Sequence, residues 1–175
     1  MKKIKKEFFS LICILFVFTA SAQNTYTSFP DPENSNGLIY KGLITKYLLQ
    51  NQPLFSWYKQ NQESYHPKDS LITAMSLAAT QKQSFILFGG SWCDDTQFIL
   101  SRFFKLQEVS GYPDSGIDFF AVDREKKSIG NLTAAFQVFR VPTIIVFKEG
   151  KETGRVVEYG TSGNWENDLL KLLLN

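Results

Sequence analysis

Residues 84–98 read SFILFGGSWCDDTQF and contain the boundary between an expected strand and an expected helix. Residues 84–88 form a short apolar run that ends at Gly89-Gly90, which is typical of a buried strand. From Asp94 to about residue 109, apolar side chains recur at helical spacing, and Asp94 and Asp95 suit the first turn of a helix. Cys93 therefore stands at the junction, directly before the helix.

Strand and helix signals alternate on both sides of this boundary. A helix is expected upstream, over residues 70–82. Downstream we expect a strand over residues 117–122, a helix over 131–139, a hairpin of strands over 143–147 and 153–159 with its turn at 148–151, and a helix over 165–174. This order predicts an α/β domain with a mixed central sheet, containing a parallel and an antiparallel pair, and with helices on both faces.

Between the N-terminal segment and this domain, apolar residues do not recur at a regular spacing. Residues 23–37 are polar and rich in Asn, Ser and Pro, which predicts an extended arm or loop. A short strand is expected over residues 38–41, with helical pieces after it. We therefore treat residues 23–69 as an N-terminal extension packed on a domain of residues 70–175.

Residues 1–22 have the three parts of a secretory signal peptide. Four lysines stand in the first six residues, an apolar run follows, and Ala20-Ser21-Ala22 is an A-x-A cleavage site. The apolar run is shorter than the roughly 20 residues that span a bilayer, which favours cleavage over an anchor. We expect a mature chain that begins at Gln23, is periplasmic or secreted, and has no stable membrane insertion.

Charge and cysteine content bound the function further. The chain has 19 Lys and Arg against 17 Asp and Glu, but four of the lysines lie in the expected signal peptide. The remainder has no basic surplus, so we expect no nucleic-acid partner. Cleavage also removes Cys13 and leaves Cys93 as the single thiol. Because exported proteins normally pair their cysteines, a lone thiol is either buried and inert or reactive.

Two short motifs resemble those of the thioredoxin superfamily. They are Trp92-Cys93-Asp94-Asp95-Thr96, directly after the expected strand, and Val141-Pro142-Thr143, at the start of the expected hairpin. The resemblance extends over residues 70–175 and is closest to exported members in which W-C-x-D-[ST] replaces W-C-x-x-C. It implies a thioredoxin-like fold, a nucleophilic Cys93 and a cis Val141-Pro142 bond beside the thiol. The active-site support that it implies comes from Trp92, Asp94, Asp95, Thr96, Val141 and Pro142.

The sequence departs from that family at two positions. Thr96 stands where dithiol members have the second cysteine, which resolves the mixed disulfide. Leu87, six residues before Cys93, stands where members commonly bury an acid. The chain alone is therefore expected not to run the dithiol cycle, and an external thiol has to resolve any adduct on Cys93.

The chemistry of Cys93 leaves two functions open. Unsatisfied amides and the positive dipole end at a helix N-terminus favour a thiolate, the form that attacks disulfides. The carboxylates of Asp94 and Asp95 oppose a further negative charge nearby. The first function is a monothiol thiol-disulfide oxidoreductase that acts on protein or small-molecule thiols and disulfides, with an external reducing thiol. The alternative is a non-catalytic thioredoxin-fold binding or assembly module.

Other candidate sites carry less weight. Arg140 either presents a guanidinium near the thiol or is a solvated charge at the start of a strand. His66 precedes Pro67 in a polar stretch, so a pair with Cys93 requires tertiary proximity. Cys93, Asp94 and Asp95 do not make a zinc set, and no phosphate-binding loop or nucleophile elbow occurs. We therefore expect no metal and no cofactor.

Overall fold

A computed structural model describes residues 25–175 of the chain. The expected signal peptide over residues 1–22, with its cleavage site and Cys13, lies outside the described residues. The helices and strands follow in chain order: β1 Tyr26–Pro30, β2 Leu38–Ile44, α1 Lys46–Gln50, α2 Ser56–Glu63, α3 Asp69–Thr80, β3 Gln83–Gly89, α4 Asp94–Ser110, η1 Asp114–Gly116, β4 Ile117–Ala121, η2 Ile129–Asn131, α5 Leu132–Ala135, β5 Thr143–Lys148, β6 Lys151–Val157 and α6 Trp165–Leu173.

The strands form one mixed sheet of six, in the order β1-β2-β4-β3-β5-β6. β3 and β4 are parallel, with Phe88 opposite Phe120. β3 and β5 are antiparallel, and so are β5 and β6. The predicted mixed sheet, with a parallel pair and a C-terminal hairpin, is confirmed. The hairpin turn lies where it was expected, because Glu149 and Gly150 both have positive φ angles, 51° and 79°, as two-residue hairpin turns require.

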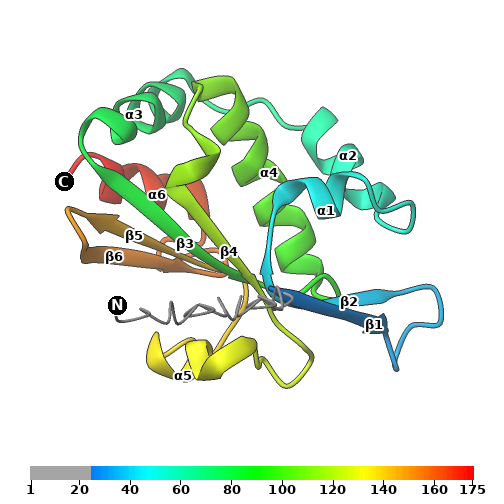
Figure 1. Cartoon of the computed structure of the whole chain (residues 1–175). Helices are drawn as coiled ribbons and strands as arrows, with labels where there is room; N and C mark the ends of the chain where they lie inside the picture. Colours follow the sequence, from blue (N-terminus) through cyan, green and yellow to red (C-terminus); the bar gives the residue numbers. More distant parts are fainter. Residues whose placement is uncertain (1–24) are drawn as a thin grey trace, which may run out of the picture.

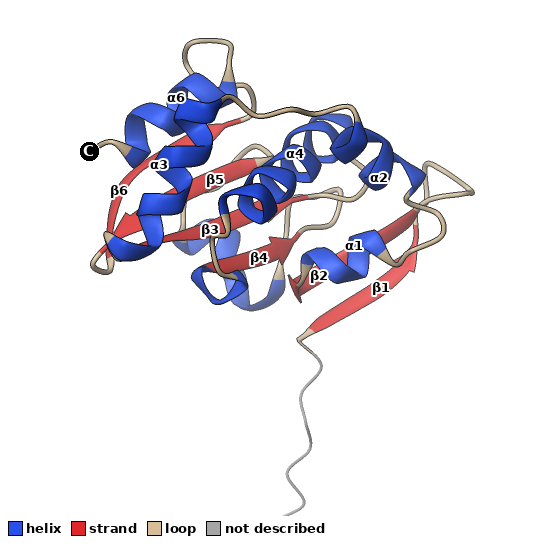
Figure 2. Ribbon diagram, turned by 90° about the horizontal axis from the view of Figure 1, so that it is seen from above, coloured by secondary structure: helices blue, strands red, loops and turns tan. Residues whose placement is uncertain are grey.

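Helices lie on both faces of the sheet, but unequally. α1, α2, α3, α4 and α6 lie over one face, and α5 lies alone on the other (Figures 1 and 2). The larger core lies between the sheet and α3, α4 and α6, and Leu87 is one of its fully buried residues. The smaller core contains Phe88, Val122, Val138, Val141 and Ile145, and Trp92 and Cys93 pack against it.

The N-terminal residues add a β-hairpin to the sheet. β1 pairs with β2, and β2 pairs with β4 through Gly42 opposite Ala121. The expectation of an extended arm or loop over residues 23–37 is wrong for Tyr26–Pro30, which is an edge strand. Most of its side chains are exposed, so the strand carries no alternating apolar pattern. Tyr26 is the exception, and its ring packs against Tyr40 of β2 with centroids 5.7 Å apart.

The helix expected over residues 131–139 is much shorter, since α5 covers only Leu132–Ala135. Gln137 has a φ of 53°, and the Val138 N–H donates to the Thr133 carbonyl at 2.7 Å. The chain therefore leaves the helical path after α5. As a consequence, Phe139 is 78% exposed instead of lying on a buried helix face.

Candidate active site

Cys93 is the last extended residue before the 17-residue helix α4, with φ −98° and ψ 121°. Its N–H donates to the Gly90 carbonyl at 3.0 Å, and its own carbonyl accepts from the Gln97 N–H at 2.9 Å. The side chain is half-buried and makes no capping hydrogen bond to the helix. The thiol is thus placed at the positive end of a long helix and remains accessible to a reactant.

A second segment lies against the thiol. The Val141–Pro142 peptide bond is cis, and the Cys93 thiol lies 3.5 Å from the Val141 carbonyl oxygen, to which it donates. The Pro142 carbonyl accepts from the Glu158 N–H at 2.8 Å, which ties this loop to the chain after β6. The fold therefore brings together the two motifs that lie 48 residues apart in the sequence.

Trp92 is held on the same side of the sheet as α5. Its indole N–H donates to the Val122 carbonyl at 3.0 Å. A Cβ on Gly90 would come within 2.4 Å of the same indole nitrogen, so the ring packs closely against a residue that has no side chain. The guanidinium of Arg124 lies over the ring at 5.2 Å from its centroid.

The three residues after Cys93 differ in their environments. Asp94 is exposed and Asp95 is half-buried, and both lie in the first turn of α4, where carboxylates complement the helix dipole. Thr96 is only 2% exposed, and its hydroxyl oxygen accepts from the Gly90 N–H at 3.3 Å. Thr96 therefore stabilises the loop that carries Cys93.

Tyr159, after β6, lies beside α4 and was not expected from the sequence. Burial raises the pKa of its hydroxyl, and the nearby negative charge of Asp95 raises it further. Its ring also packs beside Phe98 of α4, with centroids 6.1 Å apart. A tyrosine after a strand gives no sequence signal, because only the tertiary fold brings it to α4.

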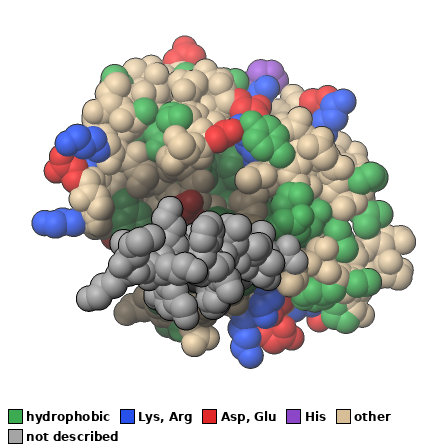
Figure 3. Space-filling model, in the orientation of Figure 1, with side chains coloured by type: hydrophobic (Ala, Val, Ile, Leu, Met, Phe, Trp, Pro, Cys, Tyr) green, Lys and Arg blue, Asp and Glu red, His purple; other side chains and the backbone are tan. Residues whose placement is uncertain are grey.

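The other residues considered from the sequence have different surroundings. Arg140 is 69% exposed and pairs with Glu158 at 3.1 Å, so its guanidinium is engaged elsewhere. His66 is exposed between α2 and α3, and the single histidine lies on the surface in Figure 3. Leu87, in β3, is fully buried in the apolar core.

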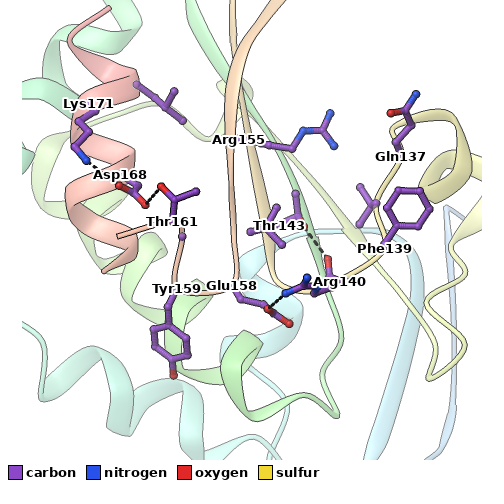
Figure 4. Close-up of a pocket in the computed structure, with 14 residues that line it drawn as sticks. Gln137, Phe139, Arg140, Thr143, Arg155, Glu158, Tyr159, Thr161, Asp168 and Lys171 are labelled. Carbon is purple, nitrogen blue, oxygen red and sulfur yellow. Dashed lines mark hydrogen bonds and ion pairs between the residues drawn. The ribbon is translucent and has the colours of Figure 1, made fainter. Parts of the chain in front are cut away.

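Two cavities flank the site. A cavity of about 780 Å³ is lined by the loop before β5 and by the residues at and after the end of β6. Its lining includes Phe139, Arg140, Glu158 and Tyr159 (Figure 4). A smaller one, about 240 Å³, lies between the N-terminal extension and the Cys93 loop, and its lining includes Trp92 and Asp94. Across residues 25–175, no helix is long and apolar enough to cross a bilayer, and no cluster of three or more potential metal ligands was found in that range.

The chain is similar to several thioredoxins. No protein-family model matches the sequence. It is 30% identical over 82 residues to thioredoxin-1 of Saccharomyces cerevisiae, covering 47% of this chain and 74% of that protein. It is also 30% identical over 77 residues to the thioredoxin of Staphylococcus haemolyticus, covering 44% of this chain and 69% of that protein.

Two further proteins also match the chain. A thioredoxin-like protein of Acanthamoeba polyphaga mimivirus is 30% identical over 70 residues. The match covers 40% of this chain and about half, 48%, of the viral protein. The structure of thioredoxin O1 from Arabidopsis thaliana is 28% identical over 59% of this chain and 89% of that chain, with a TM-score of 0.39. The identity to the yeast and staphylococcal proteins extends over more than two thirds of each, and on this ground the chain belongs to the thioredoxin superfamily.

Proposed function

We propose that the protein is an exported monothiol thiol-disulfide oxidoreductase. The Cys93 thiolate attacks one sulfur of a substrate disulfide, a Cys93–substrate disulfide forms, and the other substrate sulfur leaves as a thiolate. An external thiolate then attacks the mixed disulfide, takes the substrate sulfur into a new disulfide and releases Cys93 as the thiolate. Each step exchanges one S–S bond for another, so no further oxidant or reductant is needed.

The observation that carries this proposal is the place of the thiol. Cys93 stands half-buried at the N-terminus of α4, with its sulfur 3.5 Å from the Val141 carbonyl oxygen. Unpaired amides and the dipole at this end of a helix stabilise a thiolate. Residues 25–175 contain no other cysteine, and Thr96 occupies the position where a resolving thiol would stand. These two facts favour resolution by an external thiol, of either low molecular weight or protein origin.

Export follows from the sequence of residues 1–22. The positive segment, the short apolar run and Ala20-Ser21-Ala22 favour cleavage before Gln23 and a location in the periplasm or outside the cell. In either compartment the substrates would be protein or small-molecule disulfides, which persist under oxidising conditions.

The decisive experiment measures the reaction of Cys93 with a disulfide. The mature protein, residues 23–175, is mixed with 2-hydroxyethyl disulfide, and the adduct is followed by intact mass at neutral pH. We expect an adduct at least about tenfold faster than with a free cysteine peptide, no adduct with Cys93→Ser, and release of the adduct by added glutathione. Adduct formation no faster than with the free peptide would overturn the proposal and favour the binding or assembly module. The negative charges of Asp94 and Asp95, which disfavour a thiolate nearby, are an argument for that alternative.

A further inference from the structure

The N-terminal hairpin reaches the Cys93 loop through a pair of charged residues. Arg124, after β4, donates from Nε to Asp31 Oδ1 at 2.7 Å and from a terminal nitrogen to Asp31 Oδ2 at 2.8 Å. Asp31, after β1, has a side chain that is only 3% exposed. The contact joins positions 93 residues apart, and its two parallel hydrogen bonds fix the plane of the guanidinium.

The fixed guanidinium lies on Trp92. Its central carbon is 5.2 Å from the centroid of the indole ring, a distance at which a cation attracts the ring face. The ring also packs against Gly90. Its indole N–H donates to the Val122 carbonyl at 3.0 Å. We call Asp31, Arg124 and Trp92 the Trp92 clamp.

A second contact joins the same two parts of the molecule. The Ser91 hydroxyl donates to the Leu38 carbonyl, at the start of β2, at 2.7 Å. The Gln97 side chain in turn donates to the Ser91 carbonyl at 2.9 Å. The residues directly before Cys93 are thus held by the hairpin as well as by α4.

The clamped indole lines the 240 Å³ cavity, together with Ser91 and Asp94, which lie close to Cys93 in the chain. Leu54 and Trp57 of the N-terminal extension line the same cavity. At about 240 Å³, the cavity is smaller than the clefts of roughly 300 Å³ or more that hold drug-sized ligands, so it suits a group about the size of one side chain. A polypeptide that reacts with Cys93 must lay the residues next to its own cysteine against such surfaces, whereas a small disulfide needs only the sulfur.

We infer that Asp31 and Arg124 are positioning residues that hold Trp92 and thereby determine how strongly Cys93 prefers polypeptide disulfides over small ones. This inference rests on the proposed function of Cys93. Neither residue touches the reacting sulfur, so their loss should change the reaction with a polypeptide and leave the reactivity of the thiol itself nearly unchanged.

The test compares two uncharged disulfides, so that electrostatic changes at the thiol cancel in the ratio. One is 2-hydroxyethyl disulfide, and the other is the disulfide-linked dimer of the peptide acetyl-Phe-Ala-Cys-Ala-Phe-amide. The rate constants of adduct formation are measured on the mature chain and on the double variant Asp31→Asn with Arg124→Gln, which keeps the net charge. We expect the peptide-to-small rate ratio to fall about tenfold in the double variant.

Glu33→Gln is the matched control. Glu33 accepts from the remaining terminal nitrogen of Arg124 at 2.7 Å but is 67% exposed, so its loss should leave the ratio within about twofold. Arg124→Lys should give an intermediate ratio, because a lysine keeps the charge and loses the two-pronged geometry. It also keeps the test open if the double variant fails to fold.

A second readout reports on the indole directly. The three tryptophans give three indole N–H signals in a ¹⁵N NMR spectrum, and Trp92→Phe identifies the relevant one. We expect Asp31→Asn to shift or broaden the Trp92 signal and to leave the Trp165 signal in place. An unchanged rate ratio, or an unchanged Trp92 signal, would overturn the inference. A wild-type chain that reacts with neither disulfide would overturn the proposed function instead, and the Trp92 signal would still decide whether the clamp positions the ring.

Discussion

The hydroxyl oxygen of Thr96 accepts a hydrogen bond from the backbone N–H of Gly90, at 3.3 Å. The side chain at the third position after Cys93 therefore holds the preceding loop in place. Thr96 is 2% exposed, so this contact is shielded from water, and its loss would leave a buried amide unpaired. The residue that replaces a resolving cysteine thus has a structural role of its own.

Thr96→Cys should create a dithiol from this site. The new sulfur would stand one helical turn from Cys93, and so short a separation gives it a high effective concentration for attack on a mixed disulfide. We expect an intramolecular disulfide under oxidising conditions and a rise of about tenfold or more in insulin reduction. Thiol counting and the insulin turbidity assay measure the two effects.

Thr96→Ser is the control for this substitution, since it keeps the hydroxyl and adds no thiol. It should match the wild-type chain, which is expected to reduce insulin slowly and to keep its adduct until a thiol is added. Wild-type turnover equal to that of the Thr96→Cys variant, without external thiol, would contradict the monothiol mechanism.

Gly90→Ala should displace Trp92. The added Cβ would lie 2.4 Å from the indole nitrogen, so the ring must move and give up its hydrogen bond to Val122. We expect a loss of about 1 to 3 kcal/mol in the free energy of unfolding, together with a changed Trp92 signal in tryptophan fluorescence or NMR.

Gly111→Ala separates this effect from a general one. Gly111 has a φ of 70° and open space around its Cα, so alanine there should cost about 1 kcal/mol through backbone strain alone. An unchanged Trp92 signal is expected. Equal spectral changes in the two variants would contradict a specific contact between Gly90 and Trp92.

Elements with their own apolar pattern were predictable from the sequence. The strand before Cys93, α4 and the β5–β6 hairpin lie within one or two residues of the expected bounds, because each has a repeating buried face or a turn with glycine. β1 and the end of α5 were not predictable. β1 depends on pairing with β2, and α5 ends shortly before Gln137, which has a positive φ. Neither feature has a local sequence pattern that predicts it.

The candidate site divides in the same way. Cys93 and its neighbours form a continuous motif, so the sequence could place them at a helix start. Asp31 and Arg124 meet across 93 residues, and no spacing rule connects a carboxylate in one turn to a guanidinium in another. Tyr159 was missed for the same reason. Long-range contacts of single polar side chains have no periodic signal, so only the folded chain reveals them.

We expect the mature protein to begin at Gln23. The expectation rests on the lysine-rich start, the apolar run and Ala20-Ser21-Ala22. N-terminal sequencing and intact-mass analysis of protein recovered from the periplasm or the medium would measure it, together with a count of one thiol per chain. Recovery of a chain that retains residues 1–22 would contradict both the cleavage and the single thiol.

Acid should weaken the contact between Asp31 and Arg124 in a defined pH range. Hydrogen bonds from Arg124 lower the pKa of the Asp31 carboxyl from its ordinary value of 3.8, although burial alone would raise it. Between the lowered value and 3.8, the unfolded chain binds more protons than the folded one, so stability rises with pH there. The stabilisation is complete above the ordinary value and is lost as pH falls through the folded value.

Urea unfolding of the wild-type chain and of Asp31→Asn measures this. At pH 7 we expect the variant to be less stable by about 2 kcal/mol, because it leaves Arg124 without its buried partner. The difference should stay constant down to about pH 5 and shrink below the ordinary carboxyl value. Other carboxylates with lowered pKa values, those of Asp114, Asp123 and Asp168, titrate in both proteins and cancel in the difference. Glu33→Gln should lie within about 0.5 kcal/mol of wild type throughout. A difference that stays constant to pH 3 would show that the Asp31 carboxylate, as a charge, does not stabilise the hairpin against the Cys93 loop.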